Sequence, residues 1–455
     1  MKRYEEYTAI DSRWANYIPA SWTFSKIAEV FIERKETNDP IKTTDILSLT
    51  NTRGVIPYRE KGNIGNKAKE DLTGYRLAYP GDIVFNSMNA VIGSVGLSKY
   101  FGAVSPVYYM LYLRDAVKNN ICFFDSVFQD RVFQSGLNGL GNGILEIRMR
   151  IPMSKLKYVG VPVPPREEQD QIVRYLDWQV SKINRLIAAK RKGIALLKEH
   201  RTAKINQAVT TGIHCDTQLA YTGYNWLPYA PANWKPVPAK ALFRNITELR
   251  RLDDSMLAAT QKYGLIEQTE YMRLEGRRIV LANDNLDKWL HTEPNDFIIS
   301  LRSFQGGLEM CSKPGCVTWH YVVLRSQRNI YPDFYKWFFK SAAYIGALQK
   351  TSDFIRDGQD LRFSNFVKVG LFIIPMDEQR EIAEYLNREI PKYDVAISNL
   401  EKQIDQITEL RTRLISDVVT GQIDVRGIKV PDDEYINNEI TEEEFEEESE
   451  NNEEE

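Results

Sequence analysis

The amino-acid sequence predicts an α/β (α+β) fold in which two similar globular domains are joined by two long helices that form an antiparallel coiled coil. Three observations lead to this prediction. The segment that begins at Pro165 recurs 210 positions later at Pro375, which indicates an internal duplication of most of the chain. Apolar residues in both copies recur at steps of three, four or seven, the spacing of a helix face. The residues ahead of each copy contain apolar runs typical of strands.

The repeat fixes the expected boundaries. Pro165-Arg166-Glu167-Glu168-Gln169 matches Pro375-Met376-Asp377-Glu378-Gln379, and the register continues without a gap to Thr210 and Thr420. Fainter upstream matches, such as Thr50 and Gly54 with Thr260 and Gly264, indicate one globular fold with different loops. The expected segments are a first globular domain at 1–164, a central helix at 165–213, a second globular domain at 214–374, a C-terminal helix at 375–428 and an acidic tail at 429–455.

Each helix would contain about 45 residues and measure roughly 65–70 Å, which is too long for one small domain. We expect the other copy to cover each apolar seam, although packing of each helix on its own domain stays open. Gly193 and Pro391 lie inside the helices and should weaken or kink them. The expected contact residues are Glu168, Gln169, Ile172, Leu176, Ile183, Ile187, Glu378, Gln379, Ile382, Leu386, Ile397, Leu400 and Ile404.

The globular segments are expected to mix strands, helices and loops. Strand-like apolar runs occupy 83–85 and 108–113 in the first half, and 297–301 and 317–324 in the second. Pro314-Gly315 is a turn signal ahead of the last run.

Charge is distributed unevenly along the chain. The formal net charge is −3, but residues 431–455 contain fourteen acidic and no basic residues, so residues 1–430 carry +11. A basic body favours a polyanionic partner such as nucleic acid.

Polar and basic loop residues occupy matching places in the two halves. Arg, Asn and Gln can form paired hydrogen bonds with base edges, and Lys and Arg neutralise phosphates. As a set these residues favour DNA binding, although any single one could be an ordinary solvated loop residue. The candidates are Thr50, Asn51, Arg53, Tyr58, Arg59, Lys61, Lys67, Asn86, Asn89, Gln261, Lys262, Arg273, Arg277, Arg278, Arg302 and Gln305.

No catalytic constellation is visible in the sequence. Gly139-Leu140-Gly141-Asn142-Gly143 lacks the strand and helix context of a nucleotide-binding loop. Cys311, Cys316 and His320 have unusual spacing for zinc and no evident fourth ligand except His291, so a hairpin with buried thiols is expected and no metal. No apolar run is long enough to span a membrane and no signal peptide is evident, so we expect a cytoplasmic protein.

The duplicated plan resembles the specificity subunit of Type I restriction–modification systems. The resemblance lies in Val161-Pro162-Val163-Pro164-Pro165-Arg166-Glu167-Glu168-Gln169 and Ile373-Ile374-Pro375-Met376-Asp377-Glu378-Gln379, each followed by a long helix and preceded by a variable domain. It covers nearly the whole chain. The Glu-rich tail and Pro391 depart from the family pattern.

The resemblance implies a role without catalysis. The globular segments would be target recognition domains, each reading one half of a split sequence in double-stranded DNA. The helices would form a spacer and bind two methylation subunits, with restriction subunits completing the complex. S-adenosylmethionine, ATP and magnesium would be bound by those partner subunits, and no cofactor by this chain. Two alternatives stay open: a specificity subunit for a fused methyltransferase–nuclease outside Type I, and a coiled-coil scaffold without sequence-specific DNA binding.

We predict that the acidic tail is disordered and weakens DNA binding, because dense like charge cannot support a core and competes with phosphates for Lys and Arg. Truncation after Val430 should therefore tighten DNA binding at low salt, and the gain should fade as added salt screens the charges. A salt titration of DNA affinity measures this. Equal affinities of the full and truncated chains throughout the titration would leave the tail only a solubility role.

Overall fold

The structure is a computed structural model that describes residues 2–50, 53–61, 68–141, 150–260, 263–276, 285–300, 303–351 and 361–431. The chain divides into two compact units. Unit 1 consists of Met1–Lys190 and Lys402–Glu455, and unit 2 consists of Arg191–Glu401. Each unit therefore contains one globular domain and a part of each long helix. Residues 432–455, most of the predicted disordered tail, lie outside the described residues.

A four-stranded antiparallel sheet forms the centre of the globular domain of unit 1. Its strand order is β4 (Phe31–Arg34), β11 (Tyr108–Leu113), β8 (Ile83–Asn86) and β9 (Val95–Leu97). The smaller elements are the strand pairs β1 (Tyr7–Ala9) with β2 (Tyr17–Pro19), β3 (Thr23–Lys26) with β12 (Gly160–Val163), β5 (Leu47–Thr50) with β6 (Gly54–Pro57) and β7 (Arg76–Ala78) with β10 (Gly102–Val104), and the helices α1 (Ile27–Val30), η1 (Tyr58–Lys61), η2 (Ala90–Ile92), α2 (Ile121–Gln129), α3 (Arg131–Gly136) and α4 (Met153–Leu156).

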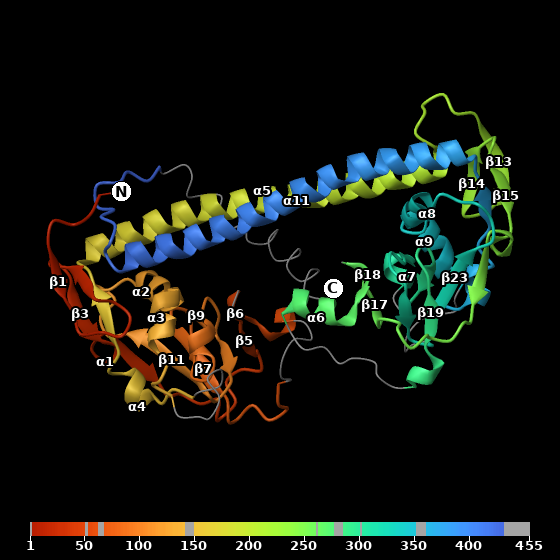
Figure 1. Cartoon of the computed structure of the whole chain (residues 1–455). Coiled ribbons are helices and arrows are strands. Elements are labelled where there is room, and N and C mark those ends of the chain that lie inside the picture. The colour runs from red at the N-terminus through yellow and green to blue at the C-terminus, as the bar shows by residue number, and fades with distance from the viewer. Residues whose placement is uncertain are drawn as a thin grey trace. The chain divides into compact units, whose positions relative to one another are not determined.

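The helices α2 and α3 lie beside this sheet (Figure 1). Aromatic side chains pack between the sheet and these helices. The ring of Phe31 lies 5.2 Å from Phe124 and 5.7 Å from Phe128. All three side chains are buried, together with Phe85 from β8. Large aromatic rings contribute much apolar area per residue, so these contacts stabilise the core.

Unit 2 repeats the same topology strand by strand. Its central sheet has the order β16 (Phe243–Ile246), β23 (Val322–Ser326), β20 (Phe297–Ile299) and β21 (Glu309–Met310). Its other elements are the strand pairs β13 (Leu219–Tyr224) with β14 (Leu227–Pro231), β15 (Lys235–Val237) with β24 (Leu371–Ile373), β17 (Leu257–Thr260) with β18 (Gly264–Glu267) and β19 (Leu290–Thr292) with β22 (Gly315–Val317), and the helices η3 (Ala239–Ala241), α6 (Gln268–Glu275), η4 (Leu286–Lys288), α7 (Ser303–Gly306), α8 (Pro332–Phe338), α9 (Ala342–Gln349) and α10 (Phe363–Phe366).

One predicted strand is wrong. The apolar run at 317–324 was expected to form a single strand, but β22 ends at Val317 and β23 begins at Val322. Between them the chain turns, and the N–H of Tyr321 donates to the carbonyl of Thr318 at 3.0 Å. The exposed Trp319 ring stacks on His320, with ring centroids 3.6 Å apart, so these residues lie outside the core.

The two long helices are α5 (Arg166–Thr211) and α11 (Met376–Val419). Both are followed by a glycine with a positive φ, 80° at Gly212 and 71° at Gly421, as in the usual C-terminal cap. Gly193 and Pro391 were expected to weaken or kink the helices, yet neither residue ends its helix.

Within each unit the parts of α5 and α11 lie side by side and run in opposite directions (Figure 1). In unit 1, Arg411 donates to Asn184 at 2.8 Å and Lys190 donates to Gln403 at 2.6 Å. In unit 2, Arg201 pairs with Asp394 at 2.8 Å and Lys204 with Glu389 at 3.9 Å. Residue numbers rise along one helix while those of its partner fall, which is the antiparallel arrangement.

The residues of the predicted apolar seam fall into two groups, those that belong to a domain core and those that lie farther along the helices. Ile172 and Leu176 belong to the core of the unit 1 domain, and Ile382 and Leu386 to that of unit 2. Ile187 and Ile397 are buried, whereas Ile183, Leu400 and Ile404 are half-buried. Leu410, which also fits the seam spacing, is 58% exposed. A spacing of three and four drifts around a helix of 3.6 residues per turn, so the seam does not face one partner throughout.

The glutamine of each Pro-x-x-Glu-Gln motif is a buried anchor inside its own domain. Gln169 donates to the Pro164 carbonyl and accepts from the Asn120 N–H, both at 2.8 Å. Gln379 likewise donates to Ile374 and accepts from the N–H of Tyr331, both at 2.8 Å. Gln169 and Gln379 were expected to contact the other helix or a partner subunit, and their burial replaces that interpretation.

The preceding glutamates also contact their own domains. The Tyr4 hydroxyl donates to Glu168, which is buried. Glu378 accepts from the Trp234 indole N–H at 2.9 Å and from Asn233 at 2.8 Å. Both carboxylates thus fasten the N-terminal segment of a domain to the start of its helix. The burial of Glu168 replaces its expected role as a subunit contact, whereas that role stays a prediction for the half-buried Glu378.

The chain beyond α11 returns to the unit 1 core. Gln171 donates to the carbonyls of Val425 and Ile428 at 3.1 and 2.7 Å, and Val430 packs against the core. The predicted tail therefore starts too early at 429, because its first residues are part of the folded unit.

We predict that Gln169→Leu lowers the free energy of unfolding of the unit 1 domain by about 2–6 kcal/mol. It leaves the Asn120 N–H and the Pro164 carbonyl buried without a partner, and each unsatisfied group costs roughly 1–3 kcal/mol. Urea unfolding measures this. The matched control is Gln406→Leu at an exposed position of α11 within unit 1, which should change stability by less than about 0.5 kcal/mol. Equal stability of the two variants would contradict the anchor.

Candidate nucleic-acid interface

A β-hairpin has the same turn geometry in both units. In unit 1, the Thr50 hydroxyl donates to the Gly54 carbonyl at 3.2 Å and accepts from the Arg53 N–H at 2.9 Å. In unit 2, the Thr260 hydroxyl makes the two equivalent bonds to Gly264 and Tyr263, each at 3.0 Å. Both glycines have positive φ, 64° and 70°. Thr50, predicted to bind DNA, therefore closes the hairpin turn.

Each hairpin is seated against a glycine of a neighbouring strand. A Cβ atom at Gly102 on β10 would lie 2.7 Å from Leu47 Cγ and 2.9 Å from the Asp45 carbonyl oxygen. A Cβ atom at Gly315 on β22 would lie 2.6 Å from the Ser255 carbonyl oxygen. The residue after each glycine donates its N–H to that same carbonyl, at 2.8 and 2.9 Å. Only glycine permits this close approach of the hairpin backbone.

A second contact of the hairpin differs between the units. Gly96 on β9 and Glu309 on β21 occupy equivalent positions, because they pair with Val84 and Ile298 of the equivalent strands β8 and β20. A Cβ atom at Gly96 would lie 3.2 Å from the Gly54 Cα. Glu309 instead approaches the unit 2 hairpin with a buried carboxylate that pairs with Lys340 at 2.7 Å.

A short helix follows each hairpin and carries the predicted basic residues. The N–H of Tyr58, the first residue of η1, donates to the Ile46 carbonyl at 2.8 Å. The N–H of Gln268, the first residue of α6, donates to the Met256 carbonyl at 3.0 Å. The helix start is thereby tied to the residue ahead of the first hairpin strand in both units.

Two of the predicted cations of unit 1, Arg59 and Lys61, lie on η1. Arg59 is 87% exposed at its side chain. Arg53 donates to the Glu60 carbonyl at 3.3 Å, and the Lys61 ammonium lies 5.3 Å from the Tyr58 ring centroid. The Tyr58 hydroxyl accepts from the Ala68 N–H at 3.0 Å, so this residue holds the adjoining chain.

In unit 2, Arg273 on α6 pairs with Glu270 through two hydrogen bonds of 2.9 and 2.6 Å. The hydrogen bond to Glu270 raises the pKa of Arg273, which stays charged. Its side chain is 71% exposed, so water screens the pair and a phosphate can compete for the guanidinium. Seven further predicted DNA contacts lie outside the described residues: Asn51, Lys67, Gln261, Lys262, Arg277, Arg278 and Arg302.

The second candidate loop is mostly structural in unit 1. Asn86 is 6% exposed, donates to the Ser94 hydroxyl at 3.3 Å and accepts from the Met88 N–H at 3.0 Å. Its amide is therefore used in the turn after β8, which replaces its interpretation as a DNA contact. Asn89 precedes η2 and is half-buried, and Gln305 of α7 is exposed in unit 2.

A buried aspartate paired with an arginine stabilises the central sheet in each domain, and sequence reasoning missed it. Asp82 accepts from Arg34 at 2.8 and 3.1 Å. Asp296 accepts from Arg325 at 2.8 and 2.7 Å. The two aspartates lie in matching Pro-x-Asp sequences, which was the available signal. The arginines come from different strands, β4 and β23, so no alignment of the two halves would pair them.

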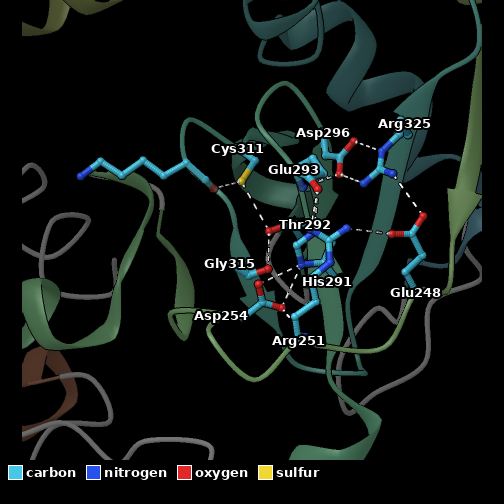
Figure 2. A network of polar contacts seen from close by, with 11 residues as sticks. Glu248, Arg251, Asp254, His291, Thr292, Glu293, Asp296, Cys311, Gly315 and Arg325 are labelled. Atoms are coloured by element: carbon cyan, nitrogen blue, oxygen red, sulfur yellow. Dashed lines mark hydrogen bonds and ion pairs between the residues drawn. The ribbon is translucent and has the colours of Figure 1, made fainter.

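Cys311, Cys316 and His291 lie near one another, as Figure 2 shows for Cys311 and His291. The Cys311 thiol donates to the Lys313 carbonyl at 2.8 Å, and Cys316 pairs with His291 across the strands β22 and β19. In the part of the chain that the structure describes, no group of His, Cys, Asp or Glu residues has the arrangement of a metal site.

The comparisons with known proteins agree with this geometry. Residues 19–196 match the sequence model of the family described as "Type I restriction modification DNA specificity domain". This segment is therefore similar to a Type I DNA specificity domain. The predicted resemblance to Type I specificity subunits is thereby confirmed.

A curated relative matches the specificity domain and the rest of the chain. It is named "Putative type I restriction enzyme MjaX specificity subunit", from Methanocaldococcus jannaschii. The two sequences are 20% identical over 446 residues, which cover 90% of this chain and 95% of the relative. The match therefore extends over both globular domains and both long helices.

The fold also recurs in solved structures. One is described as "Structural basis underlying complex assembly and conformational transition of the type I R-M system", with a TM-score of 0.64 and 13% identity, covering 89% of this chain and 99% of that chain. The HsdS subunit from Thermoanaerobacter tengcongensis matches with a TM-score of 0.49 and 12% identity, covering 89% and 98% of the two chains. The first of these shows that the fold of the specificity domain and its helices is shared. Among the described helices, none is long and apolar enough to cross a membrane.

We predict that Gly102→Ala weakens binding of the chain to its DNA target by about tenfold or more, because the added methyl group displaces the hairpin of unit 1. Gel-shift titration with a duplex that carries the target measures this. The matched control is Gly74→Ala in the same domain, where a Cβ atom would meet nothing within 4 Å. Wild-type affinity in Gly102→Ala would show that the hairpin seat plays no part in recognition.

Proposed function

We propose that this specificity subunit reads a split target in double-stranded DNA, with one half-site read by each globular domain. The observation that carries the proposal is the repetition of the whole domain, including its hairpin, around one pair of antiparallel helices. Two domains of equal topology suit a target with two parts.

The half-sites should differ in sequence, because the equivalent surfaces differ in chemistry. The hairpin of unit 1 is followed by the four-residue η1 with Arg59 and Lys61, and that of unit 2 by the eight-residue α6 with Arg273. Arginine and lysine in different places contact different base edges and phosphates. The basic character of residues 1–430, with a formal charge of +11, supports binding to the DNA backbone.

The long helices are proposed to dock two methylation subunits. Four apolar side chains on them remain largely exposed: Leu186 (47%), Leu196 (48%), Val395 (60%) and Leu410 (58%). Exposed leucine and valine side chains on a helix favour a protein partner, because their burial on association is favourable. These residues differ from the predicted contact set, most of which is used within each unit.

The catalytic reactions are proposed to take place in the partner subunits. Methylation subunits would bind S-adenosylmethionine, and restriction subunits would bind ATP and magnesium. This chain would be non-catalytic and would select the DNA sequence on which they act.

We predict that replacing residues 1–164 together with 420–431 by the equivalent segments of another specificity subunit changes one half-site only. The second segment must be included because a Cβ atom at Gly421 would lie 2.4 Å from Pro19. Methylation-aware sequencing of the host genome reads the target directly. Replacement of residues 214–374 is the matched control and should change the other half-site. If one replacement altered both half-sites, or neither, the modular function would be wrong.

A further inference from the structure

A buried histidine lies beside the segment that leads into the hairpin of unit 2. His291 on β19 is 1% exposed (Figure 2). Its Nδ1 lies 2.9 Å from both carboxylate oxygens of Asp254, and its Nε2 lies 2.9 Å from Glu293 Oε1. Both ring nitrogens therefore face carboxylate oxygens from two different segments of the chain.

This geometry requires the imidazolium form. An ionised carboxylate only accepts hydrogen bonds, and a neutral imidazole has one donor and one acceptor nitrogen. Neutral His291 would place a lone pair against a carboxylate on one side of its ring. Burial alone would lower the pKa of His291, but the hydrogen bonds to Glu293 and Asp254 outweigh it and raise the pKa above 6.5.

The other charged groups around His291 leave the network with an excess of negative charge, which the proton on His291 reduces. Arg251 pairs with Glu293 at 3.0 Å and approaches Glu248 at 3.9 Å. Arg325 pairs with Asp296 at 2.7 Å and with Glu248 at 3.3 Å. The surrounding carboxylates are Asp254, Glu293, Glu248 and Asp296, and the arginines are Arg251 and Arg325. Four carboxylates thus face two guanidinium groups, so loss of the proton on His291 leaves the network with a larger negative excess.

Two thiols and one more arginine complete the surroundings. Burial raises the pKa of Cys316, the cross-strand neighbour of His291, to about 11. Burial also raises the pKa of Cys311 above its usual value. The carbonyl of Trp289 accepts from the N–H of Arg250 at 2.8 Å, which holds the start of the same loop. Within this network His291 is the cation whose pKa is raised from its ordinary value by carboxylate partners on both ring nitrogens.

The contacts of His291 connect directly to the hairpin. Asp254 is followed by Ser255, whose carbonyl accepts from the Cys316 N–H at 2.9 Å, and by Met256, which bridges to Cys316. The next residue, Leu257, opens β17. Release of Asp254 would therefore free the segment that seats the hairpin against Gly315.

Unit 1 holds the equivalent loop without a histidine. The Lys42–Glu36 ion pair of this loop stays charged around neutral pH, because the hydrogen bond between the two groups lowers the pKa of Glu36 and raises the pKa of Lys42. Leu77 pairs with Ala103 on β7 and β10, where His291 pairs with Cys316 in unit 2. The loop ahead of the hairpin is held by the buried Asn38 instead. Its amide donates to the Thr43 carbonyl at 2.9 Å and accepts from the N–H groups of Lys42 and Thr43 at 2.8 and 3.2 Å. An amide does not change its charge with pH.

We infer that protonated His291 is a positioning residue for the hairpin of unit 2, so that recognition by unit 2 weakens with rising pH while recognition by unit 1 does not. The inference rests on the proposed function in one respect, that the hairpin contacts DNA. The direction of this pH dependence follows from the hydrogen bonds of His291 to Asp254 and Glu293. The stabilisation is fully present below the unfolded-state pKa of about 6.5 and is lost as pH rises through the higher folded-state pKa.

The first experiment needs no DNA. Hydrogen exchange of the full chain is followed by mass spectrometry between about pH 6 and 9, corrected for the intrinsic rate at each pH. Residues 250–260 and 263–268 should exchange about tenfold faster at the upper end, as expected for loss of one proton-linked contact, whereas 38–50 and 53–57 stay protected. Equal pH dependence in both hairpins, or none in unit 2, would overturn the inference.

Variants identify the titrating group. His291→Gln should make the unit 2 hairpin exchange fast at every pH and abolish the pH dependence of its exchange. The reason is that the side-chain carbonyl oxygen of the glutamine would face a carboxylate. Asp254→Asn should shift the midpoint to lower pH, because one carboxylate that raises the pKa of His291 is lost. The control is His214→Gln, another histidine of unit 2, whose side chain is 57% exposed and which should keep the wild-type profile. A wild-type profile in His291→Gln would overturn the inference.

The second experiment measures DNA binding to targets with one half-site altered at a time, over the same pH range. Discrimination at the half-site of unit 2 should fall about tenfold as pH rises, and that at the half-site of unit 1 should stay constant. If the hairpin opens with pH but discrimination does not change, the link to recognition is overturned while positioning by His291 stands. Absence of sequence-selective binding at any pH would instead contradict the proposed function.

Discussion

The buried glutamine at the start of each long helix is the contact on which the rest of the structure depends. Gln169 joins the carbonyl ahead of α5 to the backbone at the start of α2, and Gln379 does the same for α11 and α8. A buried donor or acceptor without a partner costs roughly 1–3 kcal/mol, so these bonds hold the helix start in one position. With the start fixed, the residues one turn later, Ile172 and Ile382, face the core of their own domain.

The sequence was sufficient to predict the architecture because the repeat constrains it. The match at Glu168-Gln169 and Glu378-Gln379 located both long helices, and the upstream anchors Thr50 and Thr260 fall at identical turns. The roles of these residues could not be predicted in the same way. A glutamine in a predicted helix is as compatible with a surface contact as with a buried anchor. Only the neighbouring strand and helix show that Gln169 is enclosed.

The candidate site was less accessible to sequence reasoning for a related reason. The sequence pattern predicts that polar loop residues contact DNA, yet Thr50 and Asn86 satisfy backbone groups of their own turns. Side chains that bond locally compete with any ligand for the same atoms. Residues such as Gly102 and Asp82 escaped notice, because their function depends on a neighbour that is distant in sequence.

The two copies share the features that only one residue type can provide, and differ where several can. A positive φ and a close backbone approach demand glycine, so Gly54 and Gly264, and Gly102 and Gly315, coincide. A buried aspartate needs only some arginine within reach, and Arg34 and Arg325 supply it from different strands. The loop ahead of the hairpin needs only some buried polar side chain. Topology therefore places the hairpin in each domain, and the choice of an uncharged amide or an ionised imidazole decides whether its position depends on pH.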